Sequence, residues 1–312
     1  MSTSDNSQNK IENGPLMDAN SLGNALRYVF AGRLALPDGH LPKAKHIVPV
    51  DFVGVGVTTS DDPAVDDYIL QRLTELEIKQ VRLDYTYGDE GGPVTRLLER
   101  LLATDIKVLL HLVQPFSEAQ QMKTGSAQLR WRDFVQTVAS RFGSRVSAIE
   151  VGSTSNRRRW AGYDTESFFN AWRIAFEEIK SRNIKLAGPN ISDFEPLHNI
   201  AVLTRLRREN QLPDIHTNNL FSERVTEPER FDHRIFGTKL AMRLKVNLVK
   251  KARILKKISD DFGVKEFISP AAFWTLPRIR RVLVNGEEKQ ADYLSRYLTL
   301  LAASGAMQQA YW

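Results

Sequence analysis

A regular alternation of short β-branched segments with amphipathic segments constrains the fold of this chain more than any other feature. Strand-like segments are expected at 50–58, 79–85, 107–114, 146–153, 184–191, 214–221, 265–273 and 306–312. The segments between them have helical spacing, as in 61–78, which carries acids in its first turn. Strands that alternate with helices build a parallel sheet, and eight such units predict an α/β fold of the (β/α)8 TIM barrel type.

Three parts follow from this pattern along the chain. Residues 1–15 are expected to be a disordered polar tail, 16–49 an N-terminal extension with a short helix at 21–35, and 50–312 the barrel. No helix follows the eighth strand, so either the chain is truncated after Trp312 or the N-terminal segment covers that part of the barrel. A doubly wound open sheet stays possible, although no G-x-G-x-x-G follows the first strand.

The amino-acid composition excludes several kinds of site. The 312 residues include no cysteine, which excludes disulfides, thiolate metal sites and cysteine nucleophiles. His111 and His216 have no third ligand at a recognisable spacing, so we expect neither a metal nor another cofactor. The N-terminus lacks the pattern of a secretory signal, and no run of about 18 apolar residues occurs. A cytoplasmic protein is expected.

The positive charge is concentrated in one segment. The formal net charge is +6, and residues 239–257 contain eight cations and no acid. One interpretation is peripheral contact with an anionic inner membrane through Lys250, Lys251 and Arg253. The other is an outer barrel helix whose apolar face, formed by Leu244, Leu248, Ala252 and Leu255, packs inward. Basic and aromatic residues do not interleave, so nucleic acid is not an expected partner.

Candidate site residues come from the carboxyl ends of the strands, where (β/α)8 barrels place their chemistry. The residues predicted to contact a ligand are Arg82, Asp84, His111, Asn156, Trp160, His216, Asn218, Trp274 and Trp312. Aromatic rings stack on sugar faces, while amides, arginine and histidine bond hydroxyl groups, so the set suits a carbohydrate partner. Arg82 could equally be an inward arginine paired with Glu150 or Asp84, and the histidines could be satisfied core residues.

Several short motifs in strand order resemble one family. VRLDY on the second strand, IEVGSTSNRRRWAGY on the fourth, IHTNNLF on the sixth, EFISPAAFW on the seventh and YW on the eighth look like the clan-A retaining glycoside hydrolases. The closest resemblance is to the β-xylosidase and α-L-iduronidase branch, over roughly 50–312. It implies the same barrel and a site for sugars.

The chain departs from that family at the two positions that the resemblance marks as catalytic. The family ends its fourth strand with Asn-Glu-Pro and its seventh with Thr-Glu, whereas this chain has Ser153-Thr154-Ser155 and Ser269-Pro270. Retaining hydrolysis needs two carboxyl groups about 5 Å apart. A threonine hydroxyl does not supply the proton, and proline has no nucleophile. Thr154 and Pro270 therefore indicate a vacated catalytic centre.

Three hypotheses remain open from the sequence. The first is a catalytically impaired glycoside hydrolase-like protein that binds an anionic glycan or glycan precursor, in bacterial envelope polysaccharide metabolism. Arg157, Arg158 and Arg159 at the barrel mouth could hold the anion, or they could belong to a solvated loop. The second is an active glycoside hydrolase or transglycosidase with relocated carboxylates, such as Asp84, Glu90 or Glu223. The third is an interaction protein that docks to a membrane surface or an acidic partner.

Overall fold

Eight parallel strands form a ring in the computed structural model, which describes residues 19–33, 47–220, 228–229, 246–272 and 286–312. The strands are β1 (Val53–Val57), β2 (Gln80–Thr86), β3 (Lys107–Val113), β4 (Ala148–Val151), β5 (Leu186–Ser192), β6 (Ile215–Asn219), β7 (Glu266–Ile268) and β8 (Ala310–Tyr311). Neighbours pair in the order β7-β6-β5-β4-β3-β2-β1-β8. A bridge between Ser269 and Ala310 joins the two ends of this order. The predicted (β/α)8 barrel is confirmed, and each strand overlaps its expected segment.

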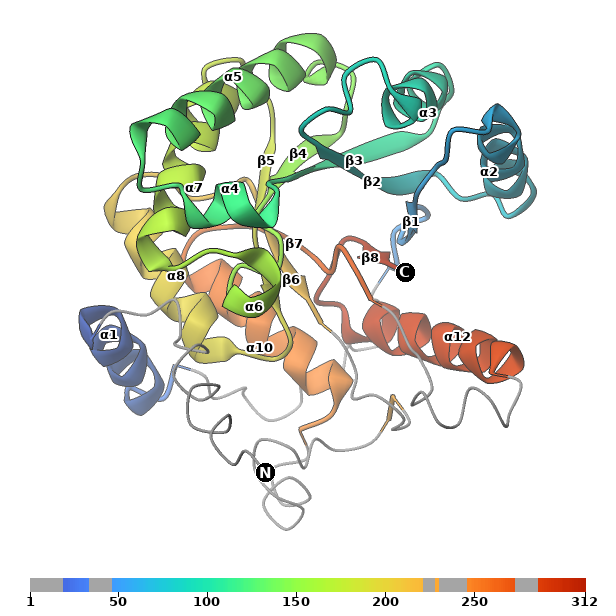
Figure 1. Ribbon diagram of the computed structural model, residues 1–312. Helices are drawn as coiled ribbons and strands as arrows, with labels where there is room; N and C mark the ends of the chain where they lie inside the picture. The colour runs from blue at the N-terminus through green and yellow to red at the C-terminus, as the bar shows by residue number, and fades with distance from the viewer. Residues whose placement is uncertain (1–18, 34–46, 221–227, 230–245, 273–285) are drawn as a thin grey trace, which may run out of the picture.

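Helices surround the ring of strands (Figure 1). They are α1 (Ala19–Phe30), α2 (Pro63–Glu75), α3 (Pro93–Leu102), α4 (Phe116–Gln120), α5 (Gly125–Phe142), α6 (Arg158–Ala161), α7 (Thr165–Lys180), α8 (Pro196–Arg208), α10 (Leu248–Asp261) and α12 (Glu287–Ser304). Side-chain caps start several of them: Asp62, Thr124, Asp164 and Asn247 each accept a bond from a backbone N–H in the first turn. The short helices α4 and α6 lie over the barrel within loops that follow β3 and β4.

Two apolar layers follow from the alternation of side chains along the strands. Outward residues pack against the helices in a large cluster that includes the fully buried Trp131 and Trp172. Inward residues form a small separate cluster inside the ring, made of Leu109, Ala148, Ala187, Ile215, Ile268 and Tyr311. The apolar filling of the ring leaves the next inward positions to polar side chains.

Helix α1 lies in the described part of the N-terminal extension, and it begins two residues before the expected helix. It packs against α8, through Ala25 and Tyr28, which are buried. Figure 1 draws α1 on the side of the barrel opposite β8. Helix α1 therefore does not take the place of a barrel helix after the eighth strand.

The basic segment forms helix α10, with Leu248, Ala252 and Leu255 buried as expected for a packed outer helix. Leu244 lies outside the described residues. Lys251 is buried, and Arg253 donates from Nε to the backbone oxygen of Ser304 at 2.9 Å. The other described lysines of the helix include Lys256 and Lys257, which pair with Asp260 and Asp261. Most of the charge on this helix is thus satisfied within the fold.

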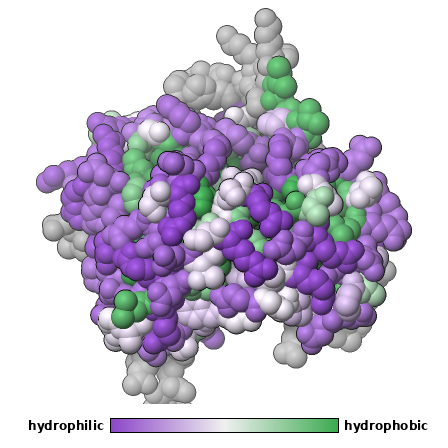
Figure 2. Space-filling model, turned by 90° about the horizontal axis from the view of Figure 1, so that it is seen from above, coloured by the Kyte–Doolittle hydropathy of each residue, from purple (hydrophilic) through white to green (hydrophobic). Residues whose placement is uncertain are grey.

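The surface is mainly polar. The face shown in Figure 2 is largely hydrophilic, with hydrophobic residues in small separate patches. Among the described helices, none has the length and apolar character needed to cross a bilayer.

Candidate functional site

An ion-pair network fills the ring above the inward apolar cluster. Arg82 and Asp84 are alternate residues of β2, so both side chains point inward, and Glu150 points inward from β4. Arg82 donates from Nε to Glu150 Oε2 at 2.7 Å and from Nη1 to Asp84 Oδ1 at 2.8 Å. Glu150 is fully buried and Arg82 nearly so. Because a buried charge is costly unless it is paired, Arg82 and Glu150 hold each other in place.

His111 on β3 extends the network to the loop that follows β4. Its Nδ1 lies 2.8 Å from Asp84 Oδ1 and its Nε2 lies 2.9 Å from the backbone oxygen of Gly152. Both neighbours are acceptors, so both bonds form together only when each ring nitrogen carries a hydrogen. Gly152 has φ +101°, and a Cβ at this position would collide with the backbone of Pro189. Glycine is therefore required where the loop meets His111.

Asp84 is the member of the network that reaches the barrel mouth, with 61% of its side chain exposed. Partial withdrawal from water acts to raise its pKa, but the hydrogen bond and charge of His111 and the charge of Arg82 hold the pKa well below the usual range. Asp84 is therefore ionised across the physiological range. It can accept hydrogen bonds, and it cannot act as a proton donor.

Asn190 on β5 connects the network to the loop after β4 and to β6. Its Nδ2 donates to Glu150 Oε1 at 2.6 Å, while its Oδ1 accepts from the backbone N–H of Thr154 at 2.9 Å and from Asn219 Nδ2 at 2.8 Å. Its own backbone N–H donates to Thr217 Oγ1 at 2.9 Å. Both oxygens of Glu150 are thus bonded to donors, so this buried carboxylate is fixed in orientation.

Thr154 and Pro270 lie just beyond the carboxyl ends of β4 and β7. Thr154 is half-buried and has φ +47°, an unfavourable region for a β-branched residue. The bond from its N–H to Asn190 holds it there. Pro270 is buried and follows Ser269, whose hydroxyl accepts the N–H of Leu220. Both positions therefore belong to the rim of the mouth.

The rest of the loop after β4 is tied to the end of β5. Asn156 donates from Nδ2 to the backbone oxygen of Ser192 at 3.0 Å and accepts the N–H of Ser192 at 2.8 Å. Arg157 pairs with Asp193 at 2.6 Å and with Glu195 at 3.0 Å. These contacts make Asn156 and Arg157 supports of the loop.

Helix α6, which continues that loop, presents side chains to solvent. Trp160 is 73% exposed, and Arg158 and Arg159 beside it are also exposed. The helix packs against α4 at Gly162, where a Cβ would collide with the backbone of Phe116. An exposed tryptophan with two neighbouring arginines thus sits on a supported turn above the strands.

Three of the predicted ligand residues face the surrounding helices. His216 and Asn218 on β6 are buried and bond Asn199 of α8, at 2.8 and 3.0 Å. The ring of Trp312 packs against Tyr297 of α12, with 5.7 Å between centroids. The physical reason is the period of two: Ile215 and Tyr311 point inward, so the residues that follow them point outward. Trp274 lies outside the described residues.

The inward polar residues of β6 are Thr217 and Asn219, which the sequence analysis does not select as ligand contacts. Both bond Asn190. The signal that could have found them is the parity of β6, because an inward Ile215 places every second residue after it on the same side.

Three further rim acids, Asp89, Asp193 and Glu195, are also held by the protein. Asp89 accepts the backbone N–H of Thr86 at 2.7 Å, and burial raises its pKa. Asp193 and Glu195 share Arg157. Glu90 is exposed, and Glu223 lies outside the described residues. Within the described part of the chain, no group of three or more His, Asp or Glu side chains is arranged to hold a metal ion.

Comparison with solved structures finds several glycoside hydrolases that share the fold of this barrel. A glucosidase from Croceicoccus marinus has a TM-score of 0.60 at 12% identity, over 84% of this chain and 60% of that protein. A family 39 glycoside hydrolase from Bacteroides cellulosilyticus WH2 gives 0.59 at 14% identity, over 85% and 56%. A monomeric β-xylosidase from Caulobacter crescentus CB15 gives 0.57 at 15%, over 86% and 61%. The chain has the fold of these glycoside hydrolases.

The resemblance drawn from the strand motifs is thus confirmed at the level of the fold. This glycoside hydrolase-like barrel spans about three fifths of the length of those three proteins. No protein family model matches the chain. No curated protein matches it either.

Proposed function

We propose that the barrel binds a glycan at the carboxyl ends of β2–β5 and does not hydrolyse it by the two-carboxylate route. One observation carries this proposal: the inward carboxylates of Asp84 and Glu150 are both bonded to Arg82. From the resemblance of the strand motifs, we expect the two catalytic carboxylates of the clan at Thr154 and Pro270, which have none. The polar groups at the mouth are therefore arranged to hold a ligand.

Proton transfer is the step that these residues do not support. Glu150 has both oxygens bonded to donors and is buried, and Asp84 is ionised. A positioned general acid contributes roughly 10² to 10⁴ in rate, which this mouth would lack. A covalent route also needs a nucleophile beside the anomeric carbon, and proline offers none.

Sugar binding is supported by the residues that reach solvent. Both bonds that hold Asp84 end on Oδ1, so Oδ2 can accept a hydroxyl hydrogen from a sugar. Trp160 offers an exposed ring for stacking on a pyranose face. Arg158 and Arg159 would bond an acidic substituent, which favours an anionic glycan. Asp84, Trp160 and these two arginines form the proposed binding set.

A glycan array followed by calorimetry tests the binding claim. The wild-type protein should bind an acidic glycan, and W160A and D84N should each weaken that binding by about tenfold, the effect of losing one stacking or charge-assisted contact. R72Q is the matched control, because Arg72 is a surface arginine of α2 paired with Glu75. Equal affinity of the wild type, W160A and D84N would contradict the proposal.

An assay of aryl glycoside hydrolysis tests the proposal that the barrel does not hydrolyse the glycan. We expect no turnover by the wild type. Turnover that D84N or E90Q abolishes would instead support an active glycoside hydrolase with relocated carboxylates. The cytoplasmic location and the role in envelope polysaccharide metabolism stay predictions from the sequence.

A further inference from the structure

A cavity remote from the barrel mouth lies between α1 and the last turns of α8 and α10. Its volume is about 530 Å³, within the range of small-molecule sites. Helices of a (β/α)8 barrel run opposite to the strands, so helix carboxyl ends lie near the amino ends of the strands. The cavity is therefore at the opposite end of the barrel from Asp84 and Trp160, and we call it the α1 groove.

The wall of the α1 groove carries a surplus of positive charge. Four arginines line it, Arg27, Arg33, Arg207 and Arg208, against one carboxylate, Asp261. That carboxylate accepts bonds from the Tyr28 hydroxyl and from Lys257. Burial acts to raise the pKa of Asp261, but these bonds hold the pKa below its usual value, so the carboxylate is ionised and already shared.

The carboxyl ends of helices offset part of this positive charge. Three helices end at the groove, and each carboxyl end carries about half a negative charge. Arg207 serves this role directly, since its Nη1 lies 3.4 Å from the backbone oxygen of Asp261. Arg208 also pairs with Glu209 at 3.6 Å, outside the groove. The other three guanidinium groups still exceed these partial charges and the one carboxylate. Among the described residues, neither Arg27 nor Arg33 has a carboxylate within ion-pair distance.

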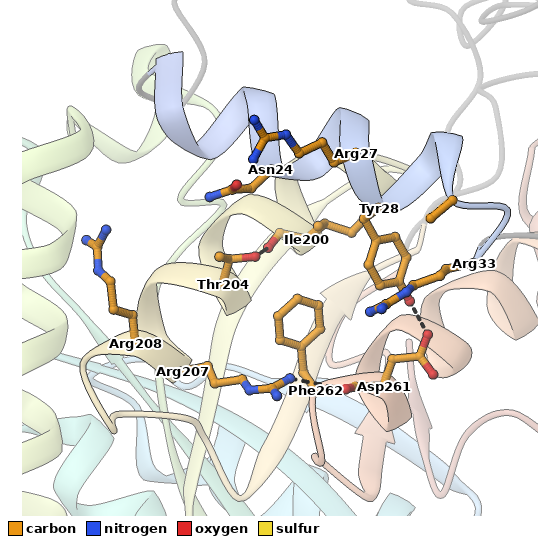
Figure 3. A pocket seen from close by; sticks show the side chains of 11 residues that line it. Asn24, Arg27, Tyr28, Arg33, Ile200, Thr204, Arg207, Arg208, Asp261 and Phe262 are labelled. Carbon is orange, nitrogen blue, oxygen red and sulfur yellow. Dashed lines mark hydrogen bonds between the residues drawn. The ribbon is translucent and has the colours of Figure 1, made fainter.

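Two aromatic rings position the guanidinium groups that face each other (Figure 3). Tyr28 of α1 and Phe262 after α10 stack with 6.2 Å between centroids. Arg33 lies over the Tyr28 ring at 5.5 Å and Arg207 over the Phe262 ring at 5.8 Å. Because the rings limit the motion of both side chains, less entropy is lost when they bind a ligand.

We infer that the α1 groove binds a phosphate-bearing ligand, gripped between Arg33 and Arg207. The planar fork of arginine matches the oxygens of a phosphate, and a groove with several arginines favours more than one phosphate group. The same chemistry is offered by a soluble organic phosphate and by the headgroup of an anionic lipid. This site is independent of the glycan site at the mouth.

Calorimetry on the full chain with sodium pyrophosphate tests the inference. We expect binding that is tighter than for orthophosphate, that weakens as salt is raised, and that R33Q and R207Q each reduce by about tenfold. R72Q on α2 should bind as the wild type does. Arg33 is exposed, so R33Q retains the fold even if R207Q, which removes a helix-end contact, does not.

Sedimentation with vesicles that contain phosphatidic acid identifies the source of the phosphate. Vesicle binding that R33Q abolishes, with pyrophosphate as a competitor, supports the site with a lipid headgroup as its ligand. Pyrophosphate binding without vesicle binding supports it with a soluble ligand. Absence of both, or affinities that R33Q and R207Q leave unchanged, overturns the inference.

Discussion

Arginine side chains stand at both ends of this barrel, but in opposite surroundings. At the mouth, Arg82 is nearly buried and bonded to two carboxylates, Asp84 and Glu150. In the α1 groove, Arg33 and Arg207 lie over aromatic rings, and the one nearby carboxylate is shared with other donors. The first arginine organises the fold, whereas the second pair retains charge for a ligand.

The number of arginines in a region of this barrel therefore says little about the role of that region. What matters is whether each charge is matched within the protein. A matched, buried charge is a structural requirement, and removing its partner leaves an uncompensated charge inside. An unmatched charge at the surface contributes little to stability and is available for binding.

Loss of Arg82 should have the largest effect on the free energy of unfolding. R82M leaves Glu150 buried without its cation, so we expect the free energy of unfolding to fall by about 3–5 kcal/mol, measured by urea denaturation. R33Q should change it by less than about 0.5 kcal/mol. The double variant R82M/E150Q should be more stable than R82M alone. Equal stability of the single and double variants would show that the orphaned charge is not the cause.

The buried side chain of His216 should have the next largest effect, on the dependence of stability on pH. His216 is buried beside Asn199, and burial, helped by the charge of Lys256, lowers its pKa to about 3. The unfolded chain therefore binds a proton near pH 6.5 that the folded chain refuses, so stability is complete above that pH and falls as the pH drops toward 3. Between pH 7 and 5 we expect this residue to cost about 2 kcal/mol of stability.

Thermal and urea unfolding of H216Q at both pH values isolates the contribution of this histidine. Glutamine can keep the donor to Asn199 and does not titrate, so the fall in stability between pH 7 and pH 5 should be smaller than in the wild type. The same fall in both proteins would assign the acid sensitivity to other groups.

The smallest effect concerns the carboxylate of the α1 groove. D261N removes the one negative side chain from its wall, so the affinity for pyrophosphate should rise by roughly threefold, the scale of a partly screened charge near the surface. Calorimetry measures this, with D260N as the control, because Asp260 pairs with Lys256 and does not line the groove. A lower affinity in D261N would show that the Tyr28 contact, and not the charge, governs the groove.

Periodicity was sufficient to predict the barrel, because each strand and helix carries its own local pattern. The sequence also indicates Glu150 and Asp84 as partners of Arg82, because Asp84 lies two residues along the same strand and Glu150 lies two strands away. The side of β6 and β8 that faces inward was not predicted, because a shift of one residue exchanges the two faces. His216 and Trp312 were placed at the mouth for this reason.

Contacts between distant segments were harder to predict from the sequence than the strands and helices. The role of Asn190 depends on Glu150, Thr154 and Asn219 meeting around it, and no motif in any one segment indicates that meeting. The packing of α1 on α8 and the α1 groove likewise arise from tertiary contacts. Local propensity carries no information on such contacts.

The join between β7 and β8 has a consequence for the dynamics of the ring. The strands β1 to β4 each pair with the next over four or more residues. The join between β7 and β8 consists of a bridge and a few bonds, such as that from the Tyr311 N–H to Ser269. Amide hydrogens there should exchange with deuterium before those of β2 and β3, as the least cooperative part of the sheet. Since Ser269 immediately precedes Pro270, each such opening also changes the outline of the mouth.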